Sequence, residues 1–201
     1  MDHESTARDR LGLAVLLLTR RRAVNRTSLN KYLFFIDLLF LKHCERSLTD
    51  ADYLKLDFGP VPRDIRDVCQ ELEWLGMLNE ERRVIGRYFE YLYTANAERV
   101  DFVTVAELLG SLFSGKSPSP DVASVIEQVE RRFQHTTASE LSQRTHRHEP
   151  WRSALWGEVL DLRQGLADTE LVSWLEGVVG VSTIFVNRAP GAASTGHASG
   201  S

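Results

Sequence analysis

The sequence predicts a compact, mainly helical α+β domain with one small β-hairpin and a winged-helix-like N-terminal part. Most of the chain repeats apolar residues at the three- and four-residue spacing of amphipathic helices. Residues 79–94 depart from that spacing, because aromatic and β-branched residues gather there on either side of Gly86. The 201 residues are 43% hydrophobic, which suffices for a packed core and excludes a largely disordered chain.

Two helices are expected in the first 45 residues. Residues 8–20 place Leu11 and Leu18 on one face. A capping sequence at 25–28 then precedes a second helix over 29–44. Few polar residues interrupt this second helix, so we expect it to be central and covered on most sides.

The most distinctive segment reads Phe58-Gly59-Pro60-Val61-Pro62. The two prolines fix their own φ angles and disfavour helix at the residue before each of them, while glycine accepts angles closed to other residues. We expect a stiff turn, with a helix over 63–75 starting directly after it. We expect all five residues, Phe58 included, to build the scaffold.

The rest of the chain returns to helices after the hairpin, in which 79–85 pairs with 88–94. A break rich in serine and proline lies at 114–120, and residues 178–186 are read as a strand or a partner-dependent segment. The expected helices cover 98–113, 121–133, 137–142 and, in one or two pieces, 159–175.

Bulk composition excludes several classes of protein. A formal charge of −4 argues against a dedicated nucleic-acid binder. Cys44 and Cys69 form neither a disulfide framework nor a zinc pattern, which favours a reducing cytoplasm. No apolar run reaches the roughly 18 residues of a membrane span. We therefore expect a cytoplasmic protein without a membrane partner.

Residues 110–117 match the phosphate-binding pattern G-x-x-x-x-G-K-[ST] letter for letter. That loop works when it follows a strand and opens a helix, so that its amides surround phosphates. Here Pro118 and Pro120 follow at once, and the preceding residues read as helix. We interpret the segment as an interhelical loop and expect no nucleotide cofactor.

His146, His148 and Glu149 are the residues most suggestive of a metal or acid–base site. No third ligand lies nearby in the sequence, and side chains two apart on a helix face different ways. We expect structural roles for these histidines. No nucleophile or paired-carboxylate pattern stands out, so no catalytic residue and no cofactor are predicted.

Basic residues on the predicted hairpin suggest an alternative. Arg82, Arg83 and Arg87 would lie on the wing of a winged helix, where such residues contact DNA phosphates. Neighbouring glutamates balance them, so a solvated surface is the favoured interpretation. DNA binding stays open as the alternative.

Four segments carry a family resemblance: 29–37, 46–62, 72–78 and 145–151. In this order they resemble the motifs of the Panacea domain, the family of SocA-like antitoxins and phage-associated proteins. Phe58 stands where the family more often has tyrosine. The resemblance implies a mainly helical domain with a small β element and no catalytic residues, in which Phe58–Pro62, His146 and Trp151 belong to the scaffold.

The resemblance also implies a function. Such proteins are antitoxins of type II toxin–antitoxin modules, which bind a cognate protein toxin and block it. Two alternatives remain: a winged-helix transcription regulator of its own operon, and an adaptor that delivers the toxin to a cellular protease. We expect the family domain over 8–165, a partner-binding extension over 166–188 and a disordered tail over 189–201. The candidate partner contacts are Trp174, Ile184, Phe185 and Val186.

Overall fold

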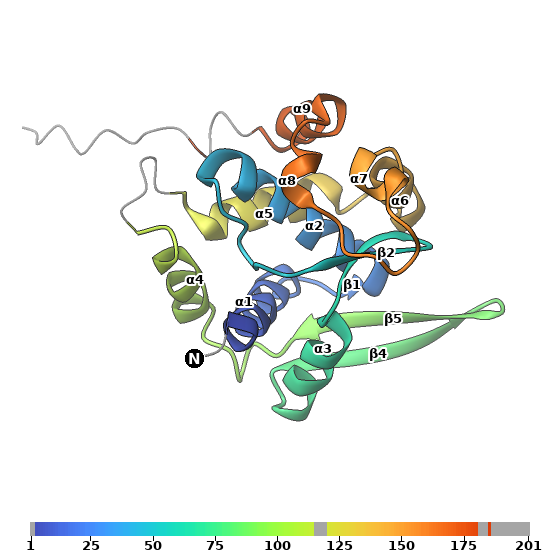
Figure 1. The fold of residues 1–201 in the computed structure, drawn as a ribbon. Helices are drawn as coiled ribbons and strands as arrows, with labels where there is room; N and C mark the ends of the chain where they lie inside the picture. Colours follow the sequence, from blue (N-terminus) through green and yellow to red (C-terminus); the bar gives the residue numbers. More distant parts are fainter. Residues whose placement is uncertain (1–2, 115–119, 181–184, 186–201) are drawn as a thin grey trace, which may run out of the picture.

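The structure is a computed structural model that describes residues 3–114, 120–180 and 185 (Figure 1). Residues 115–117 of the phosphate-loop-like segment, Ile184, Val186 and the tail over 189–201 lie outside the described residues. Within the described part of the chain, the fold is mainly helical with small antiparallel sheets, so the predicted α+β class is confirmed.

Helix α2 (Arg26–Cys44) runs through the middle of the molecule (Figure 1). The side chain of Asn25 caps it by accepting a hydrogen bond from the Ser28 backbone N–H, at 2.8 Å. Helices α1 (His3–Leu18), α5 (Val122–Phe133) and α9 (Thr169–Val179) pack around it. The prediction of a central, covered helix is therefore confirmed.

The N-terminal part has the element order of a winged helix. Helix α1, strand β1 (Val24–Asn25) and α2 are followed, after a two-stranded insertion at residues 53–62, by α3 (Ile65–Trp74), β4 (Leu78–Ile85) and β5 (Tyr88–Ala95). The three strands form one antiparallel sheet in the order β1-β5-β4. The β4–β5 hairpin, which we call the wing, extends away from the helical body (Figure 1). The predicted hairpin across Gly86 is confirmed.

The expected turn at Gly59–Pro62 is wrong in one respect: these residues form strand β3 (Gly59–Pro62), not the corner before a helix. Strand β3 pairs with β2 (Tyr53–Leu56), and the tight turn between them falls at Asp57 and Phe58. The physical reason is that a residue before proline prefers extended angles, so the two prolines favour a strand that needs few of its own N–H donors.

The remaining helices begin at side-chain caps or short turns. Their bounds are α4 (Phe102–Ser111), α6 (Ala138–Thr145), α7 (Glu149–Ser153) and α8 (Leu162–Gly165). Thr137 and Glu140 form a reciprocal capping box at α6. Buried Leu171 and Leu175 join α9 to the same core as α2 and α5. Among the described helices, none has both the length and the apolar character needed to cross a bilayer.

Candidate functional site

The motif segments of the sequence meet around α2 in a buried polar network. The Asp37 carboxylate accepts hydrogen bonds from the Thr49 backbone N–H at 2.8 Å, from the Thr49 hydroxyl, and from the Tyr53 hydroxyl at 2.7 Å. Burial raises the pKa of Asp37 to about 6 and holds the pKa of Tyr53 well above its usual value. This network fastens β2 and the loop before it to the central helix.

The buried Lys31 holds the second strand of the same hairpin. Its Nζ donates to the Pro60 carbonyl at 2.9 Å. Gly59 has a φ of 97°, and a Cβ there would lie 3.0 Å from Lys31 Nζ and well inside van der Waals contact with the Thr145 hydroxyl. Only glycine lets β3 approach α2 and α6 this closely. Gly59 and Pro60 therefore act as scaffold through the backbone.

Phe58 corrects one expectation, because its side chain is 70% exposed and does not belong to the packed scaffold. It contributes through its backbone instead, since its carbonyl accepts a hydrogen bond from the Ser142 hydroxyl at 2.9 Å. A residue at the tip of a two-residue turn points its side chain outward while its backbone can be held. The exposed ring is thus free to contact a ligand or a partner.

The two histidines of the late motif have separate environments. The His146 ring stacks on the Trp151 ring, with centroids 4.0 Å apart and planes inclined by 10°. Lys55 Nζ lies 4.6 Å from the Trp151 ring centroid. His148 is fully buried 3.4 Å from Asp168, and burial lowers its pKa. In the described part of the chain no cluster of three metal-ligating side chains occurs. The environments of His146 and His148 are those of packed side chains.

The wing combines exposed apolar side chains with arginines that have local partners. Arg83 forms a two-point contact with Glu81, at 2.7 and 2.9 Å, and the Arg82 guanidinium lies 4.6 Å from the Phe89 ring centroid. Arg87 lies exposed in the turn. Large apolar side chains at the tip are between 55% and 80% exposed: Val84, Ile85, Tyr88 and Phe89. An exposed apolar patch of this kind typically marks an interaction site.

Sequence reasoning missed this tip, although a signal was present. A half-buried strand alternates apolar and polar residues, yet Val84 and Ile85 are consecutive, as are Tyr88 and Phe89. Both faces of the hairpin end are therefore apolar, and at most one face could be covered by the domain.

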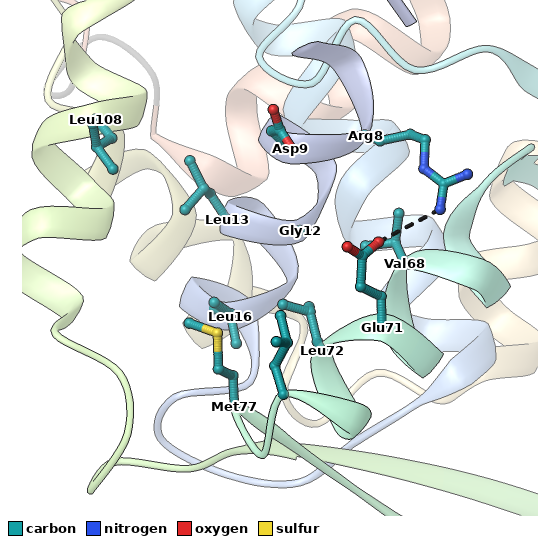
Figure 2. Close-up of a pocket in the computed structure, with 11 residues that line it drawn as sticks. Arg8, Asp9, Gly12, Leu13, Leu16, Val68, Glu71, Leu72, Met77 and Leu108 are labelled. Carbon is teal, nitrogen blue, oxygen red and sulfur yellow. Dashed lines mark ion pairs between the residues drawn. The ribbon is translucent and has the colours of Figure 1, made fainter. Parts of the chain in front are cut away.

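A groove of about 480 Å³ lies between α1, α3 and α4 (Figure 2). Its surface is largely apolar, with Leu13, Val68 and Leu108 among the lining residues. Arg8 and Glu71 form an ion pair of 3.6 Å beside it, drawn as a dashed line in Figure 2. The volume suits a small ligand or a row of apolar side chains, but few polar groups converge to orient a ligand.

The C-terminal candidates are packed where the structure describes them. The Trp174 ring centroid lies 5.7 Å from that of Phe35 and 5.6 Å from that of Phe133, and the Arg144 guanidinium lies over the Trp174 ring, 4.8 Å from its centroid. Phe185 is buried, with its ring centroid 4.6 Å from that of His43. Contact of either ring with a partner stays a prediction.

Comparison with known proteins gives one match. The family model of the SocA-like antitoxin Panacea domain matches residues 29–152, which span α2 through most of α7. No curated protein and no solved structure shows a significant match. The matched residues include the Asp37 network, the Lys31–Pro60 contact and the His146–Trp151 stack. The chain belongs to the family of SocA-like antitoxins that share the Panacea domain.

Proposed function

We propose that this chain is the antitoxin of a two-gene module and neutralises a protein toxin by direct binding, without a catalytic step. Membership of the antitoxin family implies a toxin partner. The observation that carries the proposal further is the wing tip, defined as Val84, Ile85, Tyr88 and Phe89, whose side chains project into solvent. Such residues lower solubility unless a partner covers them.

The backbone of the wing also suits a protein partner. Strand β4 lies at the edge of its sheet, so one side of the strand has no neighbour among the described strands. An exposed edge can accept an added strand through main-chain hydrogen bonds, while side chains such as Tyr88 supply the buried anchor. We propose that the wing inserts into the toxin and occludes its active or substrate site.

The net charge of −4 favours a basic toxin, because opposite charge speeds encounter and suppresses wrong partners. The part of Trp174 that remains accessible, together with Ile184, Phe185 and Val186, stays a second proposed contact region. Removing α9 would test it poorly, because Leu171 and Leu175 belong to the core. Delivery of the toxin to a protease is compatible with the same binding step.

A second candidate function is DNA-binding regulation, favoured by the winged-helix order of the N-terminal elements. In such folds the second helix of the helix-turn-helix enters the major groove. The corresponding helix here, α3, exposes Asp67, Glu71 and Glu73 and only one cation, Arg66. Phosphates would be repelled by this surface, so toxin binding is the function that we favour.

Co-expression with the toxin encoded by the adjacent gene tests the proposal. We expect the wild-type chain to restore growth and to co-purify with the toxin. The variant Tyr88→Ser with Phe89→Ser should lose both properties while keeping its melting temperature, because these side chains lie outside the core.

The matched control is Val103→Ser with Leu155→Ser, which removes two similarly exposed apolar side chains far along the chain from the wing. This control should protect cells as the wild type does. Full protection by the Tyr88/Phe89 variant would show that the wing is not the contact. Failure of the wild-type chain to bind and protect would contradict the antitoxin proposal itself.

A further inference from the structure

A cleft of about 320 Å³ separates the first turns of α2 from the β2–β3 hairpin and the start of α3. This volume is at the lower end of small-ligand sites, which enclose about 300–1,000 Å³. Part of the wall is apolar and comes from Leu54, Leu56 and Val61 of the hairpin. Phe58 also lines the cleft, so its exposed ring adds an aromatic surface there.

The charged side chains that line this cleft are all cationic: Arg26, Lys31, Arg63 and Arg66. Two of them have carboxylate partners outside the lining, since Arg26 lies 3.7 Å from Glu80 and Arg63 lies 2.9 Å from Asp52. Arg66 is exposed on the first turn of α3, and no ion pair engages it within the described residues. Arg66 and Lys31 are therefore the lining cations without a carboxylate partner among the described residues, and they suit an anion.

Asn30 supplies a more specific signal. It lines the cleft and is only 5% exposed, yet its side-chain Oδ1 has no hydrogen-bond partner among the described residues. Buried polar atoms in folded proteins are nearly always hydrogen-bonded, so each exception asks for a missing partner. The missing partner of a carbonyl oxygen is an N–H or O–H donor.

Lys31, the neighbour of Asn30, points to the same ligand class. Its side chain is fully buried, and the hydrogen bond that holds Nζ goes to a neutral group, the Pro60 carbonyl. Burial lowers the pKa of Lys31 to about 7. Within the described residues no carboxylate forms an ion pair with Lys31 itself, since Glu80 and Asp52 face Arg26 and Arg63. A bound carboxylate would supply the negative charge that this environment lacks.

We propose that the cleft binds the carboxyl-terminal residue of a peptide, or a free N-acyl amino acid of the same chemistry. The carboxylate would lie among the cations, with Arg66 as its surface partner. The amide N–H of the residue would donate to Asn30 Oδ1, and its apolar side chain would contact Leu54, Leu56 and Val61. These three features occur together in one chemical unit.

A phosphate ligand fits the cleft less well. Arg26 and Arg63 already face carboxylates, so few free charges remain for a dianion. A protonated phosphate oxygen could donate to Asn30, but phosphate has nothing apolar for the hairpin wall. The proposal therefore predicts selectivity for an apolar carboxylate over inorganic phosphate.

Calorimetric titration of the full chain with four small probes tests this selectivity. N-acetyl-leucine should bind. N-acetyl-leucinamide lacks the charge and 4-methylpentanoate lacks the N–H, so each should bind about tenfold more weakly, as expected for one lost hydrogen bond or charge contact in a buried site. Inorganic phosphate is the fourth probe and should not compete with N-acetyl-leucine.

Two variants test whether N-acetyl-leucine binds in this cleft. Arg66→Gln, at an exposed position, should weaken N-acetyl-leucine binding several-fold, whereas Arg132→Gln, an exposed arginine of α5, should leave it unchanged. Asn30→Leu should abolish the preference for N-acetyl-leucine over 4-methylpentanoate. If Asn30→Leu does not fold, the binding of the four probes to the wild type and to Arg66→Gln still tests the proposed site.

A pentapeptide that ends in leucine distinguishes the two sources of the ligand. Binding at least tenfold tighter than N-acetyl-leucine would identify a chain end as the natural ligand, and equal binding would identify a free acid. The proposal is overturned if N-acetyl-leucine does not bind at millimolar concentration, or if phosphate binds equally well. Both results are independent of growth rescue, so they are separable from the antitoxin proposal.

Discussion

Asp37 is a fully buried carboxylate whose three hydrogen-bond donors are Thr49, twice, and Tyr53. Three donors stabilise the ionised form, but removal from water outweighs them, so the pKa rises from 3.8 to about 6. Asp37 thus holds β2 to the central helix through hydrogen bonds, and it is a buried charge near neutral pH. Such a group makes stability depend on pH.

The sign follows from proton binding. Between pH 3.8 and about 6 the folded protein holds a proton on Asp37 that the unfolded chain has lost, so the contribution of Asp37 to stability decreases as pH rises through this window. A shift of about two units corresponds to about 3 kcal/mol. Lys31 does not change its charge here, since its pKa of about 7 lies above the window.

Asp37→Asn removes this titration. We expect the stability advantage of the wild type over the variant to be larger at about pH 4 than at about pH 7, by up to 3 kcal/mol. Urea unfolding at several pH values measures it. Comparing the two proteins cancels the opposite contribution of His146 and His148, whose pKa values are lowered by burial. A pH-independent difference between the wild type and Asp37→Asn would contradict the expectation.

The two hairpins differ in how they are held. The β2–β3 hairpin is held against the helices by hydrogen bonds from Lys31 and Ser142. On its other side, the Lys55 backbone N–H donates to the Glu158 carbonyl at 2.9 Å. The wing is buried at its base, at Leu78, whereas the apolar side chains of its tip are exposed to solvent. One hairpin is therefore anchored to the helices, and the tip of the other is exposed to solvent.

A glycine in each hairpin offers a matched pair of substitutions. Gly59→Ala should destabilise the fold by several kcal/mol, because the new Cβ meets Thr145 and Lys31 and because a φ of 97° strains any other residue. Gly86→Ala, at a φ of 60° with open space around it, should cost only about 1 kcal/mol. Thermal melting compares the two. Equal decreases in melting temperature would show that the close packing around Gly59 does not determine which residues this position accepts.

These elements also show what a sequence can predict. The α2 helix and the wing were predicted because their apolar spacing and their turn residue are local signals. Strand β3 was missed although its partner strand β2 is only a two-residue turn away, because two prolines in four residues are a local signal for a turn and obscure the strand. Exposure of Phe58 was missed because pattern alone does not say which side of a turn faces the domain.

At the scale of the whole molecule, charge separates the two candidate functions. The chain carries a formal charge of −4, and α3 exposes three carboxylates where a winged helix would meet the major groove. On the wing, Arg83 is engaged by Glu81 and Arg82 lies against Phe89, so that Arg87 is the wing arginine left to offset these carboxylates. A protein that binds DNA through phosphates needs free cations on that surface.

We therefore expect no measurable affinity for DNA from the region upstream of its own gene at physiological ionic strength of about 0.15 M. Fluorescence anisotropy with labelled duplex measures this, and Asp67→Lys with Glu73→Lys serves as the positive control, because two added cations on α3 should produce binding that weakens steeply with salt. Sequence-selective binding by the wild type, lost in Arg82→Glu with Arg83→Glu, would instead favour the regulator. A wild-type chain that does not bind DNA while its lysine variant does would show that the carboxylates of α3 are what prevents DNA binding by this winged-helix arrangement.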